Sequence, residues 1–131
     1  QTSLKEPQIK GLIISNTTIT RDRLTQKPIK NTWKIKESGG LSGPPLKCLS
    51  NKVIRKAYKL TKGKLVLVGV GGVSSGQDVY DKILLGCNLV QIYTALIYHG
   101  PSIVSKILSE LSSIIAKNGY KNVKDAVGKG V

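Results

Sequence analysis

The sequence contains few of the residues that metal sites, disulfides and catalytic histidines require. Cys48 and Cys87 are the only cysteines, and they lie too far apart for a metal-binding spacing or a disulfide framework. We therefore expect both to be free, buried side chains in a reducing compartment. His99 is the only histidine. Beside Gly100, it is more typical of a surface residue than of a catalytic base. We expect no metal site.

Aromatic residues and long apolar runs are also scarce. Trp33 and five tyrosines are the only aromatic residues, so no stacking platform for nucleic-acid bases is evident. No run approaches the ~20 apolar residues of a membrane span, and no signal peptide begins at Gln1. Because the chain contains no methionine, even at its start, a preceding region could hold a targeting segment.

Acidic residues are few, since 7 Asp+Glu face 21 Lys+Arg and the net charge is +14. This balance favours a polyanion, an anionic lipid surface or a phosphorylated ligand as a partner. The lysines are scattered along the chain, which is more typical of solvated faces than of a nucleic-acid interface. The 131 residues, of which 40% are hydrophobic, predict one domain with a real core.

The stretch from Leu65 to Gly72 combines a short apolar run with a glycine-rich end. Its β-branched and leucine residues predict a strand buried on both faces, as in a parallel sheet. Glycines just past the strand let the backbone approach a ligand closely and offer amide N–H groups to an anion. We interpret Gly71 and Gly72 as part of a phosphate cradle at the carboxyl end of this strand.

A second buried strand is predicted at Gly11–Ser15 and is followed by the polar cluster 16–18. These short side chains could meet a polar ligand, but their spacing alone favours ordinary turn chemistry. The long basic segment 21–37 has no periodicity, and we expect a mobile loop there. The run 38–45 holds three glycines and two prolines, which exclude a helix and could again present amides to an anion.

Three helices and a third strand are expected in the rest of the chain. Ser50 is a candidate N-cap for a helix that ends at Gly63, and Ser74 or Ser75 for a helix that ends at Gly86. The third strand is expected at Leu89–Tyr93, and Ser102 is expected to cap a long helix that closes at 117–119. A last helical turn is expected at Val123–Val127. The buried faces of the first and third helices are predicted from their spacing to be Val53, Ile54, Ala57, Tyr58 and Leu60, and Ile103, Val104, Ile107, Leu108, Leu111, Ile114 and Ile115.

Strands that alternate with helices predict right-handed βαβ units in a parallel sheet. Three strands leave two unpaired edges, so either a doubly wound sheet or part of a (β/α)8 barrel is implied. In barrels, the phosphate site often follows the last two strands. Here the last two strands are followed by the Gly71-Gly72 pair, called the glycine turn below, and by Tyr93-Thr94. We therefore favour the C-terminal part of a (β/α)8 barrel, about three βα units.

Four motifs in register resemble the C-terminal half of dihydroorotate dehydrogenase, from about Gly11 to Gly128. They are Ser15-Asn16-Thr17-Thr18, Gly39-Gly40-Leu41-Ser42-Gly43, Gly69-Val70-Gly71-Gly72-Val73 and Gln91-Ile92-Tyr93-Thr94-Ala95-Leu96. The tyrosine at position 93 resembles the pattern of the membrane-associated, quinone-using class 2 of that family. The resemblance implies an FMN-dependent barrel that oxidises dihydroorotate to orotate in pyrimidine synthesis, with ubiquinone as electron acceptor.

The resemblance also implies roles for single residues. In the family, the flavin phosphate is held at positions that match Gly43, Gly71, Gly72, Tyr93 and Thr94, and the position of Ser15 lies beside the flavin. Asn16 and Thr17 would bind the substrate. Tyr93, Leu96 and Pro101 would lie near the quinone tunnel. The catalytic base and the membrane-docking helices belong to the N-terminal half, so we name no base in this chain and expect it to be inactive alone.

Two departures and two alternatives accompany the resemblance. The segment 21–37 is longer than the family leads us to expect, and it is interpreted as an insertion. The N-terminal half of the barrel is absent from the sequence and is an expected partner, as is the membrane surface that it would bind, in the mitochondrial inner membrane or its bacterial counterpart. A sugar-phosphate barrel enzyme would share the glycine turns but leaves the rim 15–18 unexplained. A nucleic-acid-binding module rests on charge alone, and we expect no nucleic-acid partner.

Overall fold

The computed structural model describes residues 8–21 and 38–131. The predicted loop at 21–37 lies outside these residues apart from Arg21. The elements follow in the order β1 (Gly11–Ile14), η2 (Pro44–Leu46), α2 (Lys47–Thr61), β2 (Val66–Val70), α3 (Gly76–Leu84), β3 (Leu89–Gln91), α4 (Thr94–His99), α5 (Ser102–Lys117) and α6 (Val123–Ala126).

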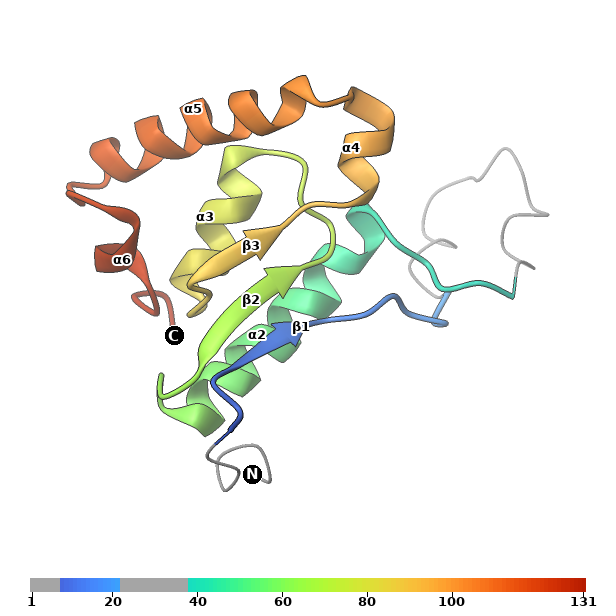
Figure 1. Cartoon of the computed structure of the whole chain (residues 1–131), viewed down its shortest axis with the longest axis horizontal. Coiled ribbons are helices and arrows are strands. Elements are labelled where there is room, and N and C mark those ends of the chain that lie inside the picture. The colour runs from blue at the N-terminus through green and yellow to red at the C-terminus, as the bar shows by residue number, and fades with distance from the viewer. Residues whose placement is uncertain (1–7, 22–37) are drawn as a thin grey trace.

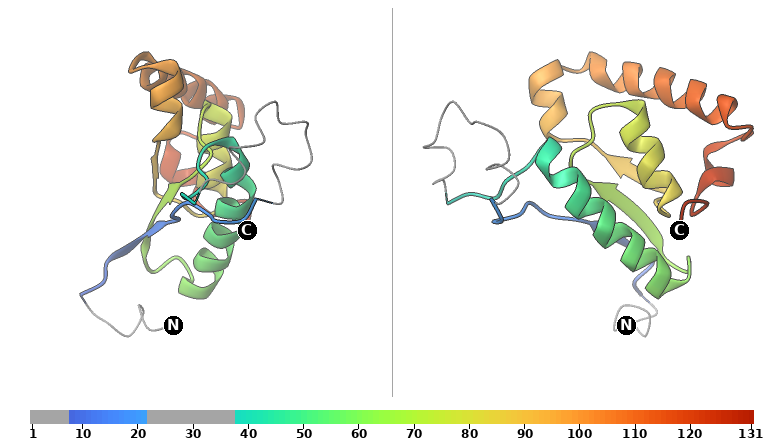
Figure 2. Two further views of the ribbon diagram at one scale, coloured as in Figure 1. Left: turned by 90° about the vertical axis from the view of Figure 1, so that its right-hand side faces the viewer. Right: turned by 180° about the vertical axis from the view of Figure 1, so that it is seen from behind.

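The three strands form a parallel sheet in the order β1-β2-β3, as predicted (Figure 1). The register places Ile13 beside Val68 and Val68 beside Leu89, so these three side chains share one face of the sheet. Helices α2 and α3 cover the opposite face (Figure 2). The element order therefore builds consecutive βα units whose strands all end at the same edge.

The prediction that the strands are buried on both faces is wrong for the described residues. Leu67 is fully buried against α2, whereas Ile13 is 65% exposed and Leu89 60% exposed. An apolar run shows that a strand can be buried on both faces, but it does not show what covers each face. Here α2 and α3 lie on one face of the sheet (Figure 2). On the other face, the side chains of Ile13 and Leu89 are exposed.

Two apolar clusters hold the helices in place. One lies between α2 and the strands and contains Ile14, Ile54, Leu65, Leu67 and Cys87. The other joins α3, α5 and α6 and is built around Ile83, Ile107 and Leu111. The chain after α6 returns to α3, where the amide of Gly128 donates to the Ile83 carbonyl at 3.0 Å. This contact satisfies a carbonyl at the carboxyl end of α3.

Several local predictions need correction. Helix α2 begins at Lys47, not near Asn51, because Pro44 and Pro45 start a helical turn that runs into it. Ser50 is consequently inside α2 and caps nothing. Ser75, as predicted, caps α3 and accepts from the Asp78 amide at 3.2 Å. The N-cap of α5 is Pro101 rather than Ser102.

The predicted helical faces are only partly correct. Val53 and Leu60 of α2, and Val104 and Leu108 of α5, are about half exposed. Helix α4 was not predicted, since a six-residue helix directly after a strand has too few residues to show a periodic pattern. Cys87 is fully buried as expected. Cys48 is exposed, since it lies in the first turn of α2 and belongs to neither apolar cluster.

Candidate functional site

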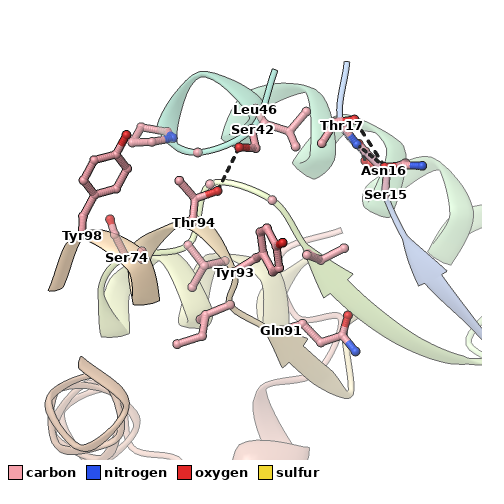
Figure 3. Close-up of a pocket in the computed structure, with 18 of the residues that line it drawn as sticks. Ser15, Asn16, Thr17, Ser42, Leu46, Ser74, Gln91, Tyr93, Thr94 and Tyr98 are labelled. Atoms are coloured by element: carbon pink, nitrogen blue, oxygen red, sulfur yellow. Dashed lines mark hydrogen bonds between the residues drawn. The ribbon is translucent and has the colours of Figure 1, made fainter. Parts of the chain in front are cut away.

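A cavity of about 1200 Å³ opens at the carboxyl ends of the strands (Figure 3). Its walls are the segments that directly follow β1, β2 and β3, together with the turn that precedes α2. The lining residues are Ile13, Ser15, Asn16, Thr17, Ser42, Gly43, Pro44, Leu46, Val70, Gly71, Gly72, Val73, Ser74, Gln91, Ile92, Tyr93, Thr94, Ala95, Tyr98 and His99. Parallel sheets bind ligands at this edge, so the cavity is the candidate site.

The rim after β1 is a short run of polar side chains. The Asn16 side-chain oxygen accepts from the amide of Thr17 at 2.7 Å, which holds the two residues in a tight local turn. Thr18 then pairs with Leu41 through two backbone hydrogen bonds of 2.7 and 3.1 Å. This pairing ties the β1 rim to the glycine-rich segment that precedes α2.

Close approach of two backbones explains why the segment before α2 is rich in glycine. A Cβ atom on Gly40 would lie 1.9 Å from Oγ1 of Thr17, so only glycine fits beside that side chain. Gly43 has a φ of +77° and lies against Thr94. The Thr94 hydroxyl donates to Ser42 Oγ at 3.0 Å, which joins the first turn of α4 to this segment (Figure 3).

Gly71 and Gly72 follow β2 with φ values of +109° and +70°, in the region that favours glycine. A Cβ atom on Gly72 would lie 2.6 Å from both the amide nitrogen and the Cβ of Lys47. The start of α2 thus packs directly on this turn. Both glycines lie outside strand and helix, at the position where backbone amides can face an anion.

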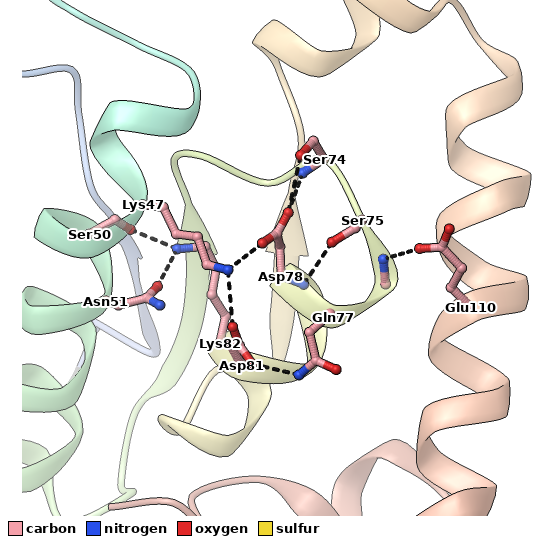
Figure 4. Close-up of polar contacts among 11 residues, drawn as sticks. Lys47, Ser50, Asn51, Ser74, Ser75, Gln77, Asp78, Asp81, Lys82 and Glu110 are labelled. Atoms are coloured by element: carbon pink, nitrogen blue, oxygen red, sulfur yellow. Dashed lines mark hydrogen bonds and ion pairs between the residues drawn. The ribbon is translucent and has the colours of Figure 1, made fainter. Parts of the chain in front are cut away.

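A polar cluster lies behind the glycine turn (Figure 4). Lys47 pairs with Asp78 at 2.5 Å and with Asp81 at 3.1 Å, and Asp78 also accepts from the Ser74 amide at 2.9 Å. Burial alone would raise the pKa of Asp78, but the hydrogen bonds from Lys47, Ser74 and Ser75 outweigh it and lower that pKa. The hydrogen bond to Asp78 raises the pKa of Lys47. Both side chains are thus charged at neutral pH.

The cavity contains eight of the ten residues that the resemblance singled out: Ser15, Asn16, Thr17, Gly43, Gly71, Gly72, Tyr93 and Thr94. Leu96 and Pro101 do not line it. Leu96 is 40% exposed on α4, and Pro101 is exposed between α4 and α5. The roles of all ten residues stay predictions.

Sequence reasoning missed several lining residues. His99 is exposed, as expected, but it also reaches the cavity, together with Tyr98 from α4. Ser42, Ser74 and Gln91 were missed as well. Each of these three lies within or next to one of the four motifs quoted above, so proximity in sequence was the available signal.

The chemistry of the lining is that of an anion-binding and hydrogen-bonding site. None of its residues is Asp, Glu, Lys or Arg, so amides, hydroxyls, the Asn16 and Gln91 amide groups and the His99 ring are its polar groups. The described residues contain no group of three or more potential metal ligands. Within the same residues, no helix combines the length and apolar character needed to cross a membrane.

The chain matches the family model described as dihydroorotate dehydrogenase over residues 1–115. It is 49% identical over 121 residues to the mitochondrial dihydroorotate dehydrogenase (quinone) of Oryza sativa, and this match covers 92% of the chain and 25% of the rice protein. It is 48% identical to the dihydroorotate dehydrogenase (quinone) of Parvibaculum lavamentivorans, and this match covers 96% of the chain and 35% of the bacterial protein.

A crystal structure of DHODH from Eimeria tenella in complex with ferulenol superposes with a TM-score of 0.83 at 39% sequence identity. The superposition covers 91% of this chain and 30% of the Eimeria tenella chain. The predicted fold class, part of a (β/α)8 barrel, is thereby confirmed. The chain spans between a quarter and about a third of the length of the relatives that it matches.

Proposed function

Because the chain belongs to the dihydroorotate dehydrogenase family, we propose that it forms the flavin-phosphate side of an enzyme that oxidises dihydroorotate to orotate and delivers the electrons to a quinone. Residues 1–131 would be the C-terminal portion of the barrel domain. The rest of the barrel would supply the catalytic base, as the family resemblance implies. The reaction belongs to pyrimidine synthesis.

The observation that carries this proposal is the convergence of two glycine turns and a helix start on one cavity. Gly43, Gly71 and Gly72 all have positive φ, and a side chain on Gly72 would collide with α2. Backbone amides at such turns, with Thr94 at the start of α4, are suited to a phosphate group. A cavity of about 1200 Å³ is also large enough for a mononucleotide with a small substrate. These residues fit FMN.

When bound, FMN would supply a hydride acceptor for dihydroorotate and a carrier of the electrons to quinone. The part of this chain is to hold the reactants. Asn16 and Thr17 stand on the β1 rim and would hydrogen-bond the substrate, while Ser15 would lie beside the flavin. Short side chains of this kind have few rotamers, so they orient a planar polar substrate at low entropic cost.

We place the quinone approach at the outer side of the site. Tyr93 is 76% exposed and lines the cavity, and Leu96 and Pro101 continue the surface along α4 and toward α5. Relatives named mitochondrial include those of rice and mouse. By analogy with them, we propose the inner membrane as the site of action, reached through the rest of the enzyme.

The test is the visible absorption of the purified enzyme that contains this chain, followed by anaerobic addition of dihydroorotate and then of ubiquinone. We expect a flavin band that dihydroorotate bleaches and ubiquinone restores. A protein without flavin, or a flavin that dihydroorotate does not reduce, would contradict the proposal.

Gly72→Ala tests the cradle itself, with Gly119→Ala as its matched control. Both glycines have a φ near +70°, but a Cβ on Gly119 meets nothing within 4 Å, whereas one on Gly72 collides with Lys47. We expect Gly72→Ala to lose flavin and Gly119→Ala to keep it. Equal flavin content in the two variants would place the phosphate elsewhere.

A further inference from the structure

Lys82 is a fully buried lysine in α3, with no exposed surface, and it does not line the cavity. Its ammonium donates to Oδ1 of Asn51 at 2.8 Å and to Oγ of Ser50 at 3.0 Å, both on α2 (Figure 4). Burying an ammonium group is costly, so its contacts must compensate for the water that it loses. An apolar side chain of similar length would fill the same space without that cost.

Ser50 passes the contact on to the sheet. Its hydroxyl donates to the carbonyl oxygen of Val70 at 2.5 Å while it accepts from Lys82. Val70 is the last residue of β2, and its carbonyl belongs to the peptide group whose N–H is that of Gly71. In a planar trans peptide, the C=O and N–H groups point in opposite directions. A carbonyl held toward Ser50 therefore aims the Gly71 amide away from α2.

The glycine turn needs such an anchor. Gly71 and Gly72 have more conformational freedom than other residues, and an amide that rotates freely binds an anion less tightly than one that is already aimed. The Lys82 contact fixes the Ser50 hydroxyl as a donor, since an ammonium group can occupy only the acceptor side of that oxygen.

We propose that Lys82 is a positioning residue for the phosphate cradle, which acts through Ser50 and the Val70 carbonyl to aim the Gly71 amide at the bound anion. The inference rests on the proposed function, because the anion is taken to be the flavin phosphate. Lys82 itself does not line the cavity.

The experiment is a double-mutant cycle with Lys82→Met and Ser50→Ala in the flavin-binding enzyme. The measured quantity is the dissociation constant of FMN, from the quenching of flavin fluorescence when the apoenzyme is titrated. We expect each single variant to weaken FMN binding about ten-fold. The double variant should bind no more weakly than either one, because both changes break one chain of contacts. Lys52→Met, an exposed change on α2, is the control and should leave the constant unchanged.

The outcomes of this titration separate the inference from the proposed function. The inference would be overturned, while the proposed function stands, if the fold-increase in the FMN dissociation constant of the double variant equals the product of the two single increases. It would also be overturned if the Lys82→Met enzyme binds FMN like the parent. A parent enzyme that binds no FMN would instead overturn the proposed function. If Lys82→Met does not fold, Asn51→Ala replaces it, since that change removes one of the two acceptors of Lys82 and leaves the lysine in place.

Discussion

Lys47 and Asp78 join the first turns of α2 and α3 through an ion pair of 2.5 Å. The glycine turn lies between these two helix starts in the sequence, and Gly72 packs on Lys47. Asp78 also accepts two hydrogen bonds from Ser74, from its amide and from its hydroxyl. One carboxylate therefore fixes both the end of the turn and the helix that packs behind it.

Asp78→Asn should destabilise the protein by about 1–3 kcal/mol at pH 7, because it leaves Lys47 without its nearest counter-charge. Asp81→Asn is the matched control. Its side chain is 32% exposed, against 11% for Asp78, so its loss should cost less than about 1 kcal/mol. Urea unfolding of the two variants measures the difference. Equal losses would show that the 2.5 Å pair is not the stronger contact.

The Asp78 pair also predicts an acid dependence. Since its pKa is lowered in the folded protein, Asp78 contributes stability that is present above its ordinary value of 3.8 and is lost as the pH falls through the lower folded value. The parent has the larger free energy of unfolding at neutral pH, and this difference from Asp78→Asn should decline below about pH 4. An advantage that persists unchanged at pH 2 would contradict this assignment.

Gly40→Ala should weaken substrate binding without removing flavin. The added Cβ would collide with the side chain of Thr17, which must then leave the position where we expect it to bind dihydroorotate. Gly39→Ala is the control, because a Cβ there meets nothing within 4 Å. We expect a KM for dihydroorotate raised about ten-fold in Gly40→Ala and unchanged in Gly39→Ala, at equal flavin absorbance per enzyme. Loss of flavin in Gly40→Ala alone would mean that this contact supports the cofactor instead.

The strand ends and glycine turns were predictable from sequence because their causes are local. The apolar run of β2 ends where Gly71 and Gly72 begin, and both glycines occupy backbone regions that other residues avoid. The order of strands and helices then leads to a parallel sheet, since parallel strands need crossover connections. Seven of the eight site candidates in the cavity come together because they follow strands whose carboxyl ends lie at the same edge. Gly43 instead precedes α2, and its segment reaches the site through the contacts of Leu41 with Thr18 and of Ser42 with Thr94.

The errors arise from contacts through space. Scattered lysines usually lie in solvent, and nothing in the sequence distinguishes the buried Lys82 from the others. Serine is a favoured N-cap residue, which made Ser50 a candidate. The two prolines before it start the helix earlier, and Ser50 lies inside α2 against Val70. The exposure of Ile13 and Leu89 depends on what covers the sheet, which an apolar pattern does not state.

The two cysteines should differ strongly in reactivity. Cys48 is exposed on α2, while Cys87 is fully buried, and its burial raises the pKa of the thiol to about 11. Because the thiolate is the reactive form, Ellman's reagent should label one thiol rapidly in the native protein and the second only after unfolding. Cys48→Ser should abolish the fast reaction. Two fast thiols in the parent protein would contradict the burial of Cys87.

Lys82 predicts an unusual rise of stability with pH. Burial lowers its pKa to about 8 in the folded protein, against about 10.4 for an unfolded chain. Between these values, the unfolded state binds more protons than the folded state, so the free energy of unfolding increases with pH. From pH 7 to pH 9.5 this amounts to about 2 kcal/mol, at 1.36 kcal/mol for each pH unit above 8.

The groups that act electrostatically on Lys82 are Cys87, Asp78 and Asp81, which raise its pKa, and Lys47, which lowers it. Lys82→Met removes the titrating group and leaves these others in place, so the difference between parent and variant isolates Lys82. Urea unfolding at pH 7.0, 8.0, 9.0 and 9.5 should show the parent gaining on the variant above pH 8. A constant difference would mean that Lys82 keeps its proton in the folded protein. The ammonium would then be held more firmly by Ser50 and Asn51 than its burial suggests.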